Sequence, residues 1–214
     1  MQNGFIFIFF DRLILILKYC NLVELFKFVS RILAFTLRTD KTTAPSVEAL
    51  RASSNIAIDV YQIFKWLVII VLWHCGANGC LSLTFVIYLI SANLFTYFHH
   101  QVWGTKYEQE SSKEADNRRF LSTLLAIAYF LVAYAYLYQC HFSSIIKWAN
   151  GPNAIDAFYI SLSNAFTLPI KGFDPITRGA RFLFASEVIN TFLFFIIILS
   201  NAIPNHIQER KKEN

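Results

Sequence analysis

The sequence predicts an all-α integral membrane protein with four transmembrane helices, a re-entrant pore helix and loop before the last of them, and an N-terminal amphipathic helix. Of its 214 residues, 56% are hydrophobic and only 15% are charged, a composition outside the range of soluble domains. Four stretches approach the ~20 apolar residues that cross a bilayer, and a polar, broken stretch at 153–181 separates the last two. The predicted spans are Tyr61 to Cys80, Leu81 to Trp103, Phe120 to Cys140, and Phe182 to Ile203.

The chain divides into three predicted parts. Residues 1–46 form an interfacial amphipathic region and a linker, in which apolar residues recur at helical spacing from Asn21 to Arg38. Residues 47–119 form a transmembrane hairpin that begins as a cytoplasmic helical extension, followed by a cytoplasmic loop. Residues 120–214 hold the re-entrant segment and a basic cytoplasmic tail. We expect Lys65, in the first span, to reach back to the membrane surface.

The N-terminal stretch at residues 5–17 is strongly apolar but carries Asp11 and Arg12 in its middle. It lacks the basic start and small-residue end of a signal peptide, so we expect no cleavage. The alternative is a further crossing by residues 3–23, which would place the N-terminus outside. Burying two charged side chains in lipid would make that crossing costly.

The basic residues indicate a topology. With a cytoplasmic N-terminus and four crossings, 15 of the 19 Lys and Arg residues lie on the inner side, as the positive-inside rule requires. The exceptions are Lys147, Lys171, Arg178 and Arg181. The net charge of +5 therefore reflects orientation, with both termini cytoplasmic, and we expect no direct nucleic-acid binding.

Three of the four cysteines lie near the outer ends of predicted spans. Cys75 and Cys80 flank a short turn from Gly76 to Gly79. These cysteines are either small buried apolar residues or a disulfide pair in an oxidising compartment. His74 and His141 neighbour two of them and leave an outer metal site open on ligand type alone. Because the sequence has no metal-ligand motif, nucleophile elbow or phosphate-binding glycine loop, we expect neither an enzyme nor a cofactor.

The re-entrant segment combines a helix and a loop. Ala154 to Thr167 has helical character, whereas Leu168 to Pro175 carries two prolines and a glycine and cannot continue a helix. Irregular backbone at membrane depth is tolerated only where protein or water covers it, so we expect several subunits around a cavity. The candidate pore-loop residues are Thr167, Leu168, Pro169, Ile170, Lys171, Gly172, Phe173 and Asp174, and the polar residues expected to line the cavity are Ser186, Asn190 and Asn201.

The loop from Gly104 to Arg119 and the C-terminal tail are the long solvated segments expected on the inner side. Their charges are either merely solvated surface or a docking surface for a cytoplasmic protein. The candidate docking residues are Lys106, Lys113, Arg118, Arg119, Arg210 and Lys211.

Residues 156–168, 172–177 and 179–181, followed by Glu187, resemble the pore module of tetrameric potassium-type channels. In that family a pore helix ends in a Thr-rich turn, a filter of the form T-V-G-Y-G-D follows, and Gly-Arg leads into an inner helix. Gly172, Phe173 and Asp174 match the first Gly, the Tyr and the Asp of the filter. The second Gly is missing, and Ile170 and Lys171 replace its Thr and Val, so the resemblance implies the architecture without potassium selectivity.

Lys171 leaves three interpretations open. It pairs with Asp174 behind the loop, or it belongs to a rearranged loop, or four copies face a common axis. Four ammonium groups about 8 Å apart would repel pairwise by roughly 2 kcal/mol at an effective dielectric of 20, which would oppose cations.

The whole chain also resembles KwaA proteins, the membrane subunit of the bacterial Kiwa anti-phage system, in length, span pattern and lack of a soluble domain. The resemblance implies a homotetramer in the bacterial inner membrane that senses phage-induced perturbation and recruits a soluble cytoplasmic partner, KwaB, which acts on DNA. The alternative is a gated ion channel of altered permeability that depolarises the membrane.

Overall fold

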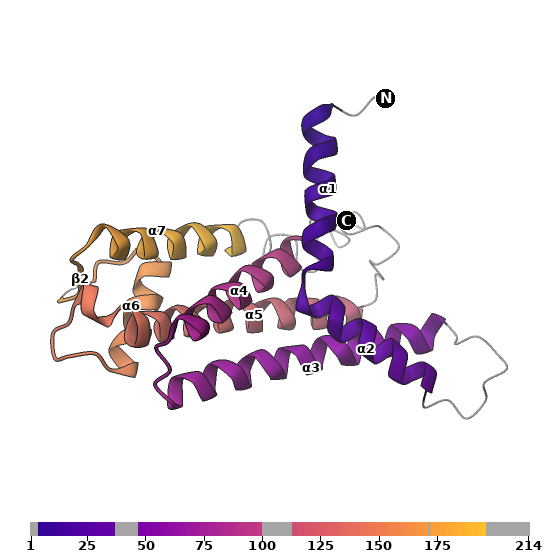
Figure 1. The fold of residues 1–214 in the computed structure, drawn as a ribbon, viewed down its shortest axis with the longest axis horizontal. Helices are drawn as coiled ribbons and strands as arrows, with labels where there is room; N and C mark the ends of the chain where they lie inside the picture. The colour runs from indigo at the N-terminus through magenta and orange to yellow at the C-terminus, as the bar shows by residue number, and fades with distance from the viewer. Residues whose placement is uncertain (1–3, 37–46, 100–112, 171, 196–214) are drawn as a thin grey trace, which may run out of the picture. The chain divides into compact units, whose positions relative to one another are not determined.

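The computed structural model describes residues 4–36, 47–99, 113–170 and 172–195 (Figure 1). It is mostly helical, which confirms the predicted all-α class. The chain forms two compact units, Met1–Val68 and Ile69–Asn214, whose boundary falls within a single long helix. The predicted three-part division stays a prediction.

The first unit contains α1 (Phe5–Tyr19), α2 (Leu22–Thr36) and most of α3 (Val47–His74). Helix α2 lies where the amphipathic helix was predicted. It is separated from α1 at Asn21, whose side-chain oxygen accepts from the amide of Val23 at 3.1 Å. Residues 3–23 are therefore not one continuous helix. The 15 residues of α1 measure about 22 Å, less than the ~30 Å hydrocarbon core of a bilayer.

Helix α2 packs on α3 through a small polar pair and an aromatic cluster. The hydroxyls of Ser30 and Ser53 lie 2.7 Å apart. The ring of Phe26 lies 5.6 Å from that of Tyr61 and 5.5 Å from that of Phe64. Many of the apolar side chains of α1 and α2 remain exposed, including every residue from Phe5 to Phe10.

Lys65 contradicts the sequence-based expectation. It is fully buried, and its Nζ lies 5.8 Å from the centroid of the Tyr61 ring. The prediction that it reaches the membrane surface is wrong, because the aromatic face one turn earlier offers the ammonium a cation–π contact within the fold.

Three helical segments of the described chain are long and apolar enough to cross a membrane: Ala52–His74, Cys80–Phe98 and Phe120–His141. They correspond to the first three predicted spans, but the first begins nine residues before Tyr61 and ends at His74. Residues 182–193 of the fourth predicted span lie in α7 (Arg178–Leu193), and residues 196–203 lie outside the described residues.

In the second unit, α5 (Lys113–Tyr136) and the π-helical turn η2 (Leu137–His141) form the centre of the core. Tyr129, Tyr136 and Tyr138 are fully buried. Helix α4 (Cys80–Phe98) packs on α5, and the side-chain amide of Asn93 donates to the carbonyl of Ala126 at 3.1 Å.

The connection from α3 to α4 is pinned to the end of α5. The Tyr136 hydroxyl donates to the carbonyl of Ala77. His141 Nε2 lies 3.1 Å from that hydroxyl and 3.2 Å from Ser82 Oγ, and Trp73 donates to Gln139 at 2.7 Å. All four cysteines are free thiols.

Between α5 and α7 the chain folds back on itself. After the 3-10 turn η3 (Ser143–Ile145) comes β1 (Ile146–Lys147), then α6 (Ala154–Ala165), and then β2 (Asp174–Pro175), which pairs antiparallel with β1. Helix α6 packs against both α5 and α7 (Figure 1).

Candidate functional site

The short helix α6 and the loop after it form the candidate site, and local sequence explains where the helix begins. The Asn153 side chain accepts from the amide of Asp156 at 2.8 Å and donates to the carboxylate of Asp156 at 2.7 Å. This reciprocal arrangement satisfies an orphan amide of the first turn and places a negative charge at the positive end of the helix dipole.

The helix ends in a Schellman motif, close to the predicted end at Thr167. The amide of Leu168 donates to the carbonyl of Ser163 at 2.8 Å, and the amide of Thr167 donates to that of Asn164 at 3.0 Å. This motif requires a left-handed residue, which is usually glycine. Here it is Thr167, with φ of 54°.

Thr167 is therefore a strained position. A β-branched residue in the left-handed region is an outlier, because its Cβ crowds the backbone. Its side chain is exposed, and within the described residues its hydroxyl makes no hydrogen bond that would offset the strain. Strain of this kind concentrates at functional positions, so Thr167 marks the loop as a candidate site.

The second half of the loop is fixed to β1, to Trp148 and to α6. Gly172 has φ of 84°, the conformation that glycine adopts cheaply. The ring of Phe173 is buried, 5.8 Å from the ring of Trp148 and 6.3 Å from that of Tyr159. Lys147 then pairs with Asp174 in the two-residue ladder.

These contacts place Phe173 inside an aromatic cluster and leave the Asp174 side chain exposed. Thr167, Leu168 and Pro169 are exposed, and Ile170 is half-buried. Lys171 lies outside the described residues, so its three interpretations stay open.

No protein family, curated protein or solved structure matches this chain.

A buried carboxyl group lies beside the last two turns of α6. Glu187 of α7 is fully buried. Its Oε2 accepts from the Tyr138 hydroxyl at 2.6 Å and from Asn164 Nδ2 at 2.6 Å, and its Oε1 lies 2.5 Å from Ser161 Oγ. One side chain thus connects α7 with η2 and with two positions of α6.

Each partner in this cluster makes a second contact. Asn164 Nδ2 lies 3.0 Å from the carbonyl of Phe184, and Ser161 Oγ lies 2.9 Å from the carbonyl of Leu131. Within the described residues no Lys, Arg or His contacts the Glu187 carboxyl.

The sequence-based prediction used Glu187 only as part of the potassium-channel resemblance and missed its partners. One available signal was a lone carboxylate in an otherwise apolar predicted span, which is costly in lipid unless it is satisfied. A second was the spacing of Ser161 and Asn164, which places both side chains on one face of a helix.

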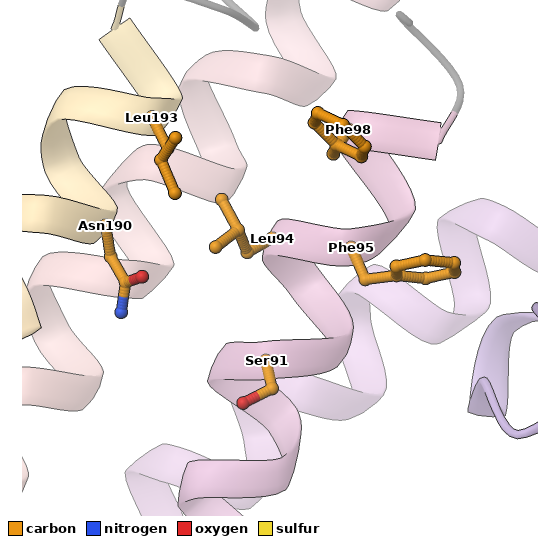
Figure 2. Close-up of a pocket in the computed structure, with 6 residues that line it drawn as sticks. All are labelled: Ser91, Leu94, Phe95, Phe98, Asn190 and Leu193. Atoms are coloured by element: carbon orange, nitrogen blue, oxygen red, sulfur yellow. The ribbon is translucent and has the colours of Figure 1, made fainter. Parts of the chain in front are cut away.

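Two of the predicted cavity residues, Ser186 and Asn190, meet at one hydroxyl group. Ser186 Oγ lies 3.1 Å from the Tyr134 hydroxyl, next to the Glu187 cluster. Asn190 donates to the same hydroxyl at 3.1 Å and also lines a groove of about 330 Å³ between α4 and α7. Figure 2 shows the residues that line it, which are Ser91, Leu94, Phe95, Phe98, Asn190 and Leu193.

This groove offers mainly hydrocarbon surface, because the Ser91 hydroxyl donates to the carbonyl of Ile87 in its own helix at 2.9 Å. Asn201 lies outside the described residues, so a cavity lined by all three predicted residues stays a prediction.

Three of the predicted docking residues lie on the described chain. Lys113 begins α5, and Arg118, which is half-buried, and Arg119 follow on the same helix. Lys106, Arg210 and Lys211 lie outside the described residues. The docking surface stays a prediction from the sequence.

Proposed function

We propose that this protein is an integral membrane protein whose segment from α5 to α7 is a channel-like module assembled as a tetramer. The observation that carries the proposal is the pairing of β1 with β2, with Ile146 opposite Pro175. This pairing joins the entry and the exit of the segment that contains α6. A segment that enters and leaves a membrane on the same side needs its two ends together.

The length of α6 supports this proposal. Its 12 residues measure about 18 Å, too short to cross the ~30 Å hydrocarbon core. A helix that stops inside the membrane needs its last carbonyls satisfied, and the Schellman motif at Thr167 accounts for two of them.

Exposed apolar side chains support both lipid contact and subunit contact. Ile155 on α6 is 83% exposed and Phe182 on α7 is 77% exposed in the single chain. Such large apolar side chains on a helix need a cover of lipid or of neighbouring subunits. On α1 every apolar residue except the buried Ile14 is exposed, a pattern that lipid covers better than a protein groove does.

Within this architecture we favour a sensor or scaffold of an anti-phage defence complex that recruits a cytoplasmic, DNA-acting partner. The role rests on the likeness to KwaA proteins. It is consistent with a loop that lacks the second filter glycine and whose Phe173 is anchored beside Trp148. A loop held in this way serves as a fixed element of the fold.

The second candidate function is a gated ion channel of altered permeability. The exposed side chains of Thr167 and Asp174 favour it, because both lie on the loop and are available to water or ions. Recording from planar bilayers separates the two functions. Unitary currents that change on neutralising Asp174 or Lys171 would exclude a pure scaffold.

Cysteine labelling tests the topology directly. In a cysteine-free background, single cysteines at Asn150 and Ile176 should both react with a membrane-impermeant maleimide from the outer side. A cysteine at Lys113 should react only after the membrane has been permeabilised with detergent. If Asn150 and Ile176 react from opposite sides, the segment crosses the membrane and the proposal is wrong.

Native mass spectrometry of the purified protein tests the assembly, and four copies are expected. Co-purification tests the partner. Reversing the charges of Lys106, Lys113, Arg118 and Arg119 should release a bound soluble protein, and the same reversal at Arg178 and Arg181 is the control. Full retention of that protein would contradict the proposed docking surface.

A further inference from the structure

If the carboxyl group of Glu187 is ionised, its partner Ser161 has fewer donor protons than hydrogen-bond contacts. A serine hydroxyl has one proton to donate, and a backbone carbonyl has none. Ser161 Oγ nevertheless lies within hydrogen-bond distance of two oxygens, the carbonyl of Leu131 at 2.9 Å and Glu187 Oε1 at 2.5 Å. Two such contacts need two protons, and Ser161 supplies one.

Glu187 is the group that can supply the second proton. If it carries a proton on Oε1, it donates to Ser161 Oγ, and Ser161 donates to the carbonyl of Leu131. Oε2 is then the carbonyl oxygen of a neutral acid, and it accepts from Tyr138 and Asn164. Every contact of Ser161 Oγ and of the Glu187 carboxyl group then has one donor and one acceptor.

The surroundings of the group agree with a neutral acid. Glu187 is fully buried, and an isolated buried charge is costly unless it is paired. The ionisable groups that face it are Tyr138 from η2 and Tyr134 from α5. From α6 it is faced only by the neutral Ser161 and Asn164, and on its own helix Arg178 and Arg181 are exposed.

We propose that Glu187 is a buried proton-binding site, and that the bound proton locks α6 to α7 through Ser161. Loss of the proton leaves Ser161 with one proton for two acceptors, so either the contact with Leu131 or the contact with Glu187 is lost. Ser161 and Asn164 lie in the two turns of α6 before the loop, so ionisation would loosen the helix that carries Thr167. This inference does not depend on whether the loop lines a pore.

Infrared difference spectroscopy of the purified protein tests the protonation state of Glu187. At neutral pH the wild-type protein should show the carbonyl stretch of a protonated carboxylic acid, and this band should be absent from the Glu187→Gln variant. In Ser161→Ala the band should remain but shift to higher frequency, because its proton has lost its acceptor. Absence of any band that depends on Glu187 would overturn the proposal.

Thermal stability supplies a second measurement. A neutral glutamine can donate to Ser161 and accept from Tyr138 and Asn164, so Glu187→Gln should match the wild type at acidic pH, where the carboxyl group is neutral in both the folded and the unfolded protein. In the unfolded chain Glu187 ionises in the ordinary acidic range of a glutamate, so above that range folding must take up a proton, and the wild-type unfolding temperature should fall with rising pH relative to that of Glu187→Gln. The same pH dependence in both proteins would show that the folded state does not hold the proton.

Hydrogen exchange links the proton to the helix. Amides at the end of α6 should exchange faster at alkaline pH in the wild type than in Glu187→Gln, after correction for the intrinsic pH dependence of exchange. Amides of α4 are the internal control and should not differ between the two proteins. If the α6 amides also do not differ, the proton does not lock α6 to α7. Because no ion conduction is measured, failure here leaves the proposed function untouched.

Discussion

Replacing Thr167 with glycine should stabilise the protein, although it removes a side chain. Thr167 has φ of 54°, and a residue with a Cβ in the left-handed region costs roughly 1–2 kcal/mol. Glycine also gives the unfolded chain more freedom, which costs about 0.4–1 kcal/mol. The difference predicts a net gain of about 0.5–1 kcal/mol, or a rise of about 1–4 °C in Tm for a chain of this size.

The matched control is Thr167→Ala. Alanine keeps the Cβ and so keeps most of the strain, and within the described residues the hydroxyl that it removes makes no hydrogen bond. We expect its stability to lie within about 0.5 kcal/mol of the wild type. Gly172→Ala should act in the opposite direction and cost about 1–2 kcal/mol, because φ there is 84°.

Gly172→Ala also separates backbone strain from crowding. A Cβ at this position would meet the Ala149 side chain at 3.5 Å, an ordinary van der Waals distance, so the loss comes from the backbone. Thermal unfolding in detergent, followed by circular dichroism, measures all three variants. If Thr167→Gly is no more stable than Thr167→Ala, the left-handed residue is not strained and the reasoning fails.

Four further substitutions test individual contacts and helix caps of the fold. Phe173→Ala should cost about 3 kcal/mol, because it empties a buried site beside Trp148, and tryptophan fluorescence should report the added exposure of that indole. Asn153→Ala and Thr177→Ala should each cost about 1 kcal/mol in thermal unfolding, because each removes an N-cap, of α6 and α7 respectively; a loss at only one of them would contradict equal capping. Tyr136→Phe should cost about 1 kcal/mol in thermal unfolding, because the Ala77 carbonyl loses its donor, and unchanged stability would argue against this contact.

Elements with a repeating pattern were predictable from the sequence. The first three apolar spans, the amphipathic α2 and the start of α6 at Ala154 follow from hydrophobic length, helical spacing and turn residues. Each depends on residues close together in the chain. The end of α6 was placed within two residues, because Pro169 and Gly172 cannot continue a helix.

Contacts between distant residues were not predictable in this way. The ladder that pairs Lys147 with Asp174 joins positions 27 residues apart. Its strands are two residues long, too short to show a repeating pattern in the sequence. The burial of Lys65 reverses a general tendency of lysine at membrane surfaces, because a ring of its own helix faces the ammonium. Glu187 was visible as an isolated charge, but only the fold identifies the three side chains that satisfy it.

The strained turn at Thr167 lies three residues after Asn164, whose side chain bonds to the buried carboxyl group of Glu187. A left-handed threonine persists only where its surroundings over-determine the backbone. Asn164 provides such a constraint, because its side chain bonds to Glu187 and to the carbonyl of Phe184, while its own carbonyl accepts from the Thr167 amide.

A double-mutant cycle measures this coupling. In an Asn164→Ala background the end of α6 is free to shift, so the turn can relax and Thr167→Gly should gain less than it does in the wild type. We expect an interaction energy of about 0.5 kcal/mol or more between the two sites. If the two effects add within about 0.3 kcal/mol, the strain at Thr167 is set by its own turn alone, and the Glu187 cluster does not hold the loop.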